Sequence, residues 1–221
     1  MKRFRKFALA LEPLEWPNNF RYQFYLRSRP LCNFIERELA REPMNIMASS
    51  KLVLVGTQRA NKNFFINSSD VASFSVPIDV TAYEQMESEE DIYSFMADFS
   101  QRGVLSCPNI ATEARNHLVG LIEKFRSIGF ANAWVFKKKT LRARKLLAEL
   151  RCKITQTDFL LTLEVTSNGA VVFSQVILRT DPDELAFHSE FKDIVFQEHC
   201  LAVSKRVGNN PLIEIPYADL S

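Results

Sequence analysis

The sequence predicts an α+β fold, in which an antiparallel or mixed sheet packs against helices. Three observations lead to this prediction. Segments whose apolar residues alternate with polar ones are interspersed with segments of helical spacing. An Asn168-Gly169 pair separates two apolar runs, which is a strong hairpin signal. The 221 residues are 47% hydrophobic and 24% charged, the composition of an ordinary globular protein.

The first quarter of the chain is predicted to be mostly extended. Apolar residues alternate with polar or small ones over residues 7–11 and 20–26, on either side of a loop with prolines and asparagines. This period of two predicts an antiparallel pair of strands. From Pro30 to Arg41 the apolar residues follow helical spacing, which predicts a helix with proline in its first turn. Three short strands are then expected, at residues 51–57, 63–67 and 72–80.

Two helices are predicted in the middle of the chain. Ser88 and the acidic residues after it are typical of a helix start, because a serine oxygen and negative charges both stabilise the first turn. Gly103 is expected to end that helix. The second helix has apolar residues at three- and four-residue spacing from Ala114 to Ile128, and Gly129 is expected to terminate it.

The remaining residues predict the order β-α-β-β-α-β over about residues 131–216. The elements are a strand, a basic helix at about 140–150, the Asn-Gly hairpin, a helix that starts with an Asp-Pro pair, and a final strand. This order is that of the ferredoxin-like split βαβ fold. We therefore expect two α+β regions, 1–105 and 106–221, with the ferredoxin-like order in the second. One continuous domain is the alternative.

The sequence predicts a cytoplasmic protein. Its basic start is followed by an apolar run over Phe7–Leu11 only, shorter than the ~7–15 residue segment of an export signal. No apolar stretch has the length of a membrane span, so no membrane partner is expected. The cysteines are far apart and include no CxxC pair, which argues against a disulfide framework or a zinc spacing. We expect free thiols at Cys32, Cys107, Cys152 and Cys200.

No catalytic motif is found, and we therefore predict a protein without catalytic residues, cofactor or metal. The nucleophile elbow, the phosphate-binding loop, the dinucleotide fingerprint and the zinc-protease motif are all missing from the sequence. His188 and His199 are expected on one helix, about 16 Å apart at about 1.5 Å per residue, too far to share a metal ion. The alternative is an enzyme with a dispersed site around these two histidines, with Glu190 and Cys200 nearby.

Charge is segregated along the sequence, although the net charge is only +2. Residues 137–153 hold eight basic residues against the single acid Glu149, and residues 79–98 hold seven acidic residues and no basic one. Two candidate faces follow. The acidic face contains Glu84, Glu87, Glu89, Glu90 and Asp91. The basic face contains Lys137, Lys138, Lys139, Arg142, Arg144 and Lys145.

These observations favour a non-catalytic cytoplasmic protein that works by binding another protein. Segregated charges can steer a partner and fix its orientation. A bacterial immunity protein that neutralises a cognate toxin is the concrete version, by analogy with the class, and the acidic face would then contact a basic target such as a nuclease. The alternative is a nucleic-acid-binding accessory protein that uses residues 137–153, although base-stacking aromatic residues are missing between Lys137 and Lys153.

Overall fold

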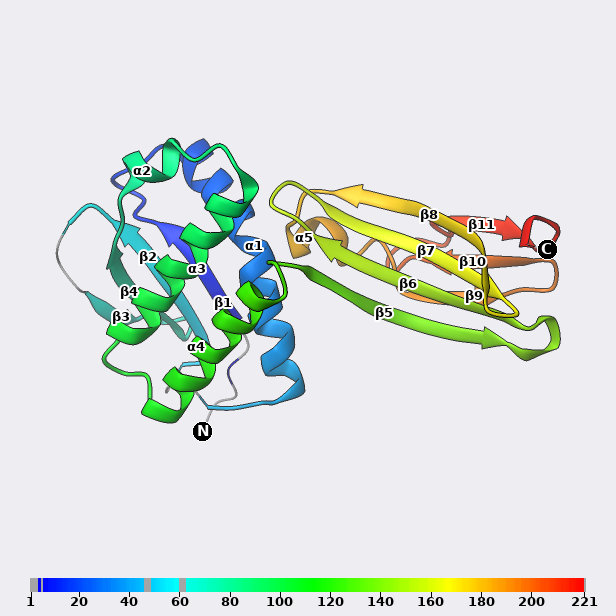
Figure 1. The fold of residues 1–221 in the computed structure, drawn as a ribbon, viewed down its shortest axis with the longest axis horizontal. Helices are drawn as coiled ribbons and strands as arrows, with labels where there is room; N and C mark the ends of the chain where they lie inside the picture. The colour runs from blue at the N-terminus through cyan, green and yellow to red at the C-terminus, as the bar shows by residue number, and fades with distance from the viewer. Residues whose placement is uncertain (1–3, 5, 46–48, 60–62, 221) are drawn as a thin grey trace. The chain divides into compact units, whose positions relative to one another are not determined.

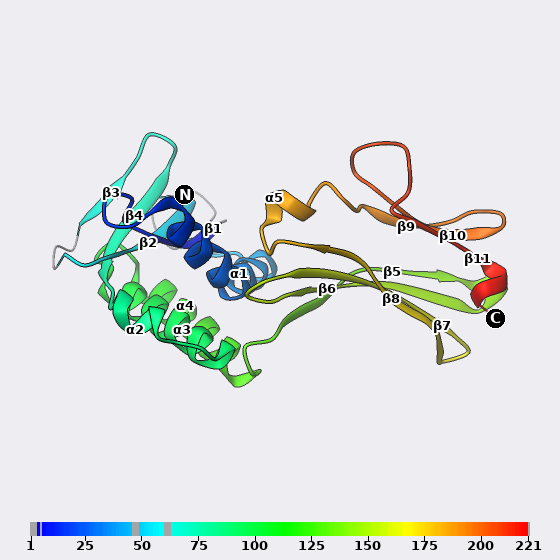
Figure 2. The same ribbon diagram turned by 90° about the horizontal axis from the view of Figure 1, so that it is seen from above.

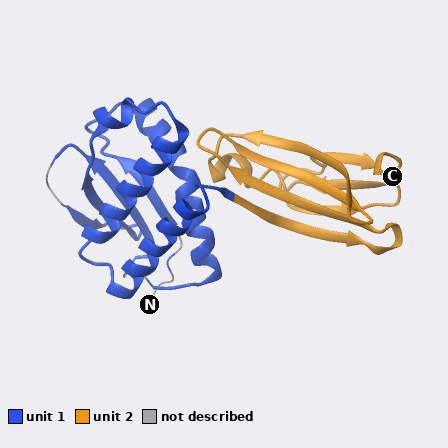
Figure 3. Ribbon diagram, viewed as in Figure 1, with its two compact units in different colours: residues 1–132 blue, residues 133–221 orange. Residues whose placement is uncertain are grey.

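The chain forms two compact units, residues 1–132 (unit 1) and 133–221 (unit 2) (Figure 3). The structure, a computed structural model, describes residues 4, 6–45, 49–59 and 63–220. Each unit contains helices and strands, and the predicted α+β class is confirmed (Figure 1).

Unit 1 is built on a four-stranded sheet with the order β1-β2-β4-β3. Strands β1, β2 and β4 run parallel to one another, and β3 pairs antiparallel with β4. Every second residue of the three parallel strands is buried, and Leu9, Leu54 and Phe74 form one register row across them. The strand bounds are Lys6–Leu11 (β1), Lys51–Thr57 (β2), Phe64–Ile66 (β3) and Val71–Pro77 (β4). The four strands predicted at these places are thus present, the last two shorter than expected.

The helices of unit 1 supply the other half of its core. Helices α3 and α4 lie side by side over one face of the sheet (Figures 1 and 2), and α1 packs along β1. Their rings and aliphatic side chains meet the buried sheet residues in a single apolar cluster, which includes Phe24, Ile35, Phe99 and Phe125. The helix bounds are Asn18–Arg41 (α1), Val80–Glu84 (α2), Glu89–Ser106 (α3) and Thr112–Ser127 (α4).

The predicted strand at 20–26 is wrong, and so is a helix start at Pro30. Helix α1 begins at Asn18 and continues through Pro30, whose carbonyl accepts a hydrogen bond from Asn132 Nδ2 at 2.9 Å. Phe20 and Phe24 are four residues apart, so a helix places them on one face as well as a strand does. Burial against the sheet therefore decides the conformation, and β1 pairs with β2 in place of this segment.

Helix α3 begins as predicted but does not end at Gly103. The Ser88 Oγ accepts a hydrogen bond from the Asp91 N–H at 3.0 Å, which confirms the predicted cap. At Gly103 the helix passes so close to β2 that a Cβ atom there would lie 2.5 Å from Leu54 Cδ1. The glycine is thus required for close packing within the helix, and α3 continues to Ser106.

Unit 2 consists of two sheets around one apolar core. The first has the order β5-β6-β7-β8 and the second the order β11-β10-β9. Both contribute to the core, for example Leu161 from the first sheet and Leu201 from the second. The strands are Asn132–Leu141 (β5), Leu146–Ile154 (β6), Phe159–Ser167 (β7), Ala170–Thr180 (β8), Asp193–Phe196 (β9), Cys200–Ser204 (β10) and Ile213–Pro216 (β11). The only α-helix of the unit within the described residues is α5, Glu184–Phe187.

The ferredoxin-like order is not confirmed, because the basic helix at 140–150 is wrong. These residues form the end of β5, a 3-10 turn at Arg142–Arg144, and β6. Leu146, Ala148 and Leu150 are buried as alternate residues of β6, and this period of two is the spacing of a strand. The turn closes at Lys145, which has a left-handed φ of 54°.

Two other predictions for the second half have different outcomes. The hairpin is confirmed: β7 and β8 pair antiparallel, and Asn168 and Gly169 have φ values of 51° and 86°, as a type I′ turn requires. The long last helix is wrong, since α5 stops at Phe187 and the chain continues into β9.

The predicted division at 105/106 falls within the last turn of α3, shortly before α4. These helices pack against each other within unit 1, and the chain divides at 132/133 in the structure.

We expect Gly103→Ala to lower the free energy of unfolding of unit 1 by about 1–3 kcal/mol, because the added methyl group overpacks a filled core. The matched control is Gly120→Ala, on the exposed side of α4, where an added Cβ meets no atom within 4 Å. That variant should gain about 1 kcal/mol from helix propensity. Urea titrations followed by far-ultraviolet circular dichroism measure both. Equal stability of the two variants would contradict the close-packing argument.

Candidate functional site

The predicted acidic residues are gathered on α2 and at the start of α3. Glu84 ends α2, Glu87 lies in the connection, and the other three form the first turn of α3. We call Glu84, Glu87, Glu89, Glu90 and Asp91 the acidic surface, and all five are exposed. Within the described residues Glu84, Glu87 and Glu90 form no ion pair. The helix dipole stabilises acidic residues in a first turn, but it does not account for Glu84 or Glu87.

A small pocket with an aromatic wall adjoins the acidic surface. Glu89 and Glu90 line it together with Tyr93, Phe130 and, from α4, Arg126, and its volume is about 350 Å³. The rings of Tyr93 and Phe130 are stacked, with centroids 5.4 Å apart. Carboxylates beside aromatic faces attract a cationic group, so this pocket suits a lysine or arginine side chain of a partner.

The charge of Arg126 in this pocket is already compensated. Its guanidinium group contacts Asp98 at 2.7 Å and Glu123 at 3.5 Å. The other charged residues of the lining are Glu89 and Glu90.

Phe130 reaches its place through an unusual backbone conformation. Gly129 has φ 66° and Phe130 has φ 58°, and their N–H groups donate to Arg126 O and Phe125 O at the end of α4. This is the Schellman ending of a helix, and it confirms the predicted stop at Gly129. A positive φ at a bulky residue costs energy. The Phe130 ring stacks on that of Tyr93, a contact that sequence reasoning missed.

Half of the basic face forms ion pairs inside unit 2. Lys137 and Lys139 contact Asp193 at 3.5 and 2.8 Å, and Lys138 contacts Glu149 at 2.8 Å. The Lys138 hydrogen bond is the main cause that holds the pKa of Glu149 below its usual value. Burial raises the pKa of Asp193, but its hydrogen bond with Lys139 and the nearby charges outweigh this and lower it.

The other three residues of the basic face lie exposed around the 3-10 turn. The Arg144 guanidinium stacks over the Tyr217 ring at 4.3 Å. Arg142 and Lys145 have neither an ion pair nor a ring contact with the described residues. The excess of basic residues in the sequence therefore does not form one continuous unpaired surface.

The histidines proposed for an enzyme site are not brought together. His188 follows α5, whereas His199 lies in the turn between β9 and β10, at the opposite end of unit 2 (Figure 2). Glu190 pairs with Lys205 at 3.2 Å, and the Cys200 Sγ donates to Gln197 Oε1 at 3.1 Å. The prediction that both histidines share a helix is wrong. Within the described residues no group of three or more His, Cys, Asp or Glu side chains could hold a metal ion.

All four cysteines are free thiols. Cys32, Cys107 and Cys152 are buried, and burial raises the pKa of Cys32 to about 12. Cys200 is half-buried. Among the described residues no helix combines the length and the apolar character that crossing a membrane requires.

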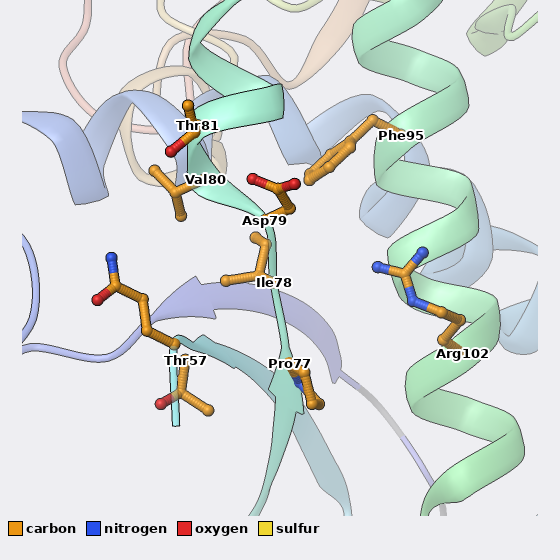
Figure 4. Close-up of a pocket in the computed structure, with 9 residues that line it drawn as sticks. Thr57, Pro77, Ile78, Asp79, Val80, Thr81, Phe95 and Arg102 are labelled. Atoms are coloured by element: carbon orange, nitrogen blue, oxygen red, sulfur yellow. The ribbon is translucent and has the colours of Figure 1, made fainter. Parts of the chain in front are cut away.

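A larger pocket lies beyond the carboxyl ends of β2 and β4 (Figure 4). Its volume is about 660 Å³. The ends of the two strands, the residues after them, the start of α2 and two residues of α3 line it: Thr57, Gln58, Pro77, Ile78, Asp79, Val80, Thr81, Phe95 and Arg102. Sequence reasoning missed this pocket. The ends of the strands predicted at 51–57 and 72–80 could have indicated it, had their parallel pairing been recognised.

Comparison with protein-family models, with curated proteins and with solved structures finds no match to this chain.

We expect Glu149→Gln to lower the unfolding free energy of unit 2 by about 1 kcal/mol at neutral pH, because Lys138 loses its charged partner. Since the folded-state pKa of Glu149 is lowered, its contribution is complete above about pH 4.3, the ordinary glutamate value. It is lost as the pH falls through the folded-state value. The variant should thus show a shallower loss of stability in acid.

Fluorescence of Trp134, which packs on the core of unit 2, reports this unfolding in a Trp16→Phe background. The control Glu198→Gln changes an exposed carboxylate and should leave the curve unchanged. If the acid-unfolding curve of Glu149→Gln superimposed on that of the parent, Glu149 would not be a stabilising partner of Lys138.

Proposed function

We propose that this chain is a non-catalytic protein-binding protein that acts in the cytoplasm and holds a basic partner against its acidic surface. The main support is that exposed carboxylates adjoin a pocket walled by the stacked rings of Tyr93 and Phe130. The acidic surface is exposed, with three carboxylates that have no ion pair within the described residues. On the basic face three of the six cations contact Asp193 or Glu149, and the other three form no ion pair within the described residues.

The concrete form of this proposal is an immunity protein that neutralises a cognate toxin. A toxin that acts on nucleic acid needs a positively charged surface for phosphate groups. An exposed array of carboxylates is complementary to such a surface and accelerates association with it. Binding there would exclude the nucleic acid, so neutralisation needs no chemistry on the part of this chain.

The aromatic pocket gives the proposed interface an anchor. Interfaces obtain most of their affinity from a few well-packed contacts, whereas exposed charges mainly set the rate and the orientation. A lysine or arginine of the partner would place its charge between Glu89 and Glu90 and its apolar stem on the rings of Tyr93 and Phe130.

The cytoplasmic location is supported by the thiols. Three of the four cysteines are buried and none forms a disulfide, as is usual where thiols remain reduced.

Charge reversal of the acidic surface should abolish partner capture. The variant replaces Glu87, Glu89, Glu90 and Asp91 with lysine. We expect a tagged form of the parent chain to retain a basic protein from native cell extract, with retention that falls as salt rises, and the variant to retain none. Mass spectrometry identifies the partner, and titration of the purified pair gives the affinity.

The matched control reverses four exposed carboxylates outside this surface, Glu42, Glu113, Glu198 and Glu214, for the same change in net charge. It should retain the partner. A milder variant changes the same acidic-surface positions to Gln or Asn. It introduces no positive charge at the start of α3 and should weaken capture of the partner. Unchanged capture by the lysine variant would eliminate this face. If the parent chain retained nucleic acid and no protein, and Lys145→Gln abolished that retention, nucleic-acid binding through the basic face would be favoured.

Neutralisation itself is tested with the captured partner. Expressed alone it should arrest growth, and co-expression of the parent chain, but not of the charge-reversed variant, should restore growth. If expression of the partner left growth unaffected, the partner would not be a toxin. The immunity proposal would then be wrong, while the proposal that the chain binds a basic protein would be unaffected.

A further inference from the structure

The larger pocket of unit 1 lies where parallel sheets place their ligand sites. Gln58 follows β2 and Asp79 follows β4, and Arg102 extends from α3 on the other side. The carboxyl ends of parallel strands leave loops that face a common space, and ligands of open α/β sheets bind there. The volume of about 660 Å³ is within the range of small-molecule sites. The pocket shares no residue with the acidic surface.

Two opposite charges line this pocket without pairing. The Arg102 guanidinium points from α3 toward the loop that carries Ile78 and Asp79 (Figure 4). It forms no ion pair or side-chain hydrogen bond with the described residues. Asp79 Oδ1 accepts the N–H of Ala82 at 3.0 Å, and its second oxygen has no partner among them. Each charged group thus has hydrogen-bonding capacity left for a ligand.

The remaining lining separates into an apolar part and a neutral polar part. Pro77, Ile78 and Phe95 supply apolar surface, and the Thr81 hydroxyl and the Gln58 amide supply neutral hydrogen-bonding groups. Thr57 is committed elsewhere, because its hydroxyl donates to Glu15 at 2.8 Å. The pocket therefore offers one anionic contact, one cationic contact and an apolar surface between loops.

We propose that this pocket binds a small zwitterion, a free α-amino acid with an apolar side chain, with its ammonium group at Asp79 and its carboxylate at Arg102. A purely anionic ligand would meet the Asp79 carboxylate, and a purely cationic one would meet the Arg102 guanidinium. A zwitterion suits both groups, because each of its charges then lies beside an opposite charge and neither lies beside a like charge. The apolar side chain rests on Ile78 and Phe95.

The test is a titration of the full chain with each standard free amino acid at millimolar concentration, followed by nuclear magnetic resonance of the backbone amides. At least one amino acid should saturate and shift the amides of Gln58, Asp79 and Thr81. Its N-acetyl derivative lacks the ammonium group and its methyl ester lacks the carboxylate. Each should bind at least about tenfold more weakly, the loss expected for one charged hydrogen bond.

Variants of the two charged residues make the test specific. Asp79→Asn removes the charge but still caps α2, because asparagine is as good a cap as aspartate. This variant and Arg102→Gln should each weaken binding at least about tenfold. The control Arg142→Gln changes an exposed arginine of unit 2 and should leave the affinity unchanged. The proposal is overturned if no amino acid saturates, if the N-acetyl derivative binds as tightly, or if both variants bind like the parent.

Discussion

The carboxylate of Glu36 joins α1 to β1, and the core of unit 1 is packed around these two elements. Arg29 is almost completely buried, and the Glu36 carboxylate lies 3.6 Å from its guanidinium group on the same helix. The same carboxylate contacts Lys6 at 3.3 Å and accepts the N–H of Phe7 at 3.2 Å. The buried Arg29 holds this carboxylate in place on α1. The contacts of Glu36 with Lys6 and Phe7 then favour one position of α1 along β1. The helix thereby completes the core on which α3 and α4 pack.

Ionic groups serve two different purposes in this chain. In unit 2 they hold strands together: Asp193 and Glu149 each contact two cations, and Arg151 continues the network to Glu164 at 3.0 Å. In unit 1 the carboxylates of the acidic surface are directed to solvent. A sum of charges along the sequence cannot separate these cases, because Lys137 and Asp193 are far apart in the chain and meet only in the fold.

Local signals in the sequence predict the structure well, and the failures arise where distant contacts decide. The Ser88 cap and the Asn168-Gly169 turn are confirmed because each depends on a few neighbouring residues. The predictions for residues 20–26 and 140–150 are wrong because the apolar residues of these segments fit both a helix and a strand. Burial against the rest of the unit selects the conformation. The acidic surface could be listed from the sequence, but the ring of Phe130 beside it and the pocket at Arg102 depend on packing between separate elements.

The burial of three thiols has a practical consequence for anyone who works with this molecule. Cys32, Cys107 and Cys152 are inside their cores, while Cys200 retains access to solvent at the β9–β10 turn. A maleimide dye reacts with an accessible thiolate and not with a buried thiol. The native chain thus carries a single attachment point for a fluorophore, on unit 2, and needs no engineered cysteine to be followed in solution.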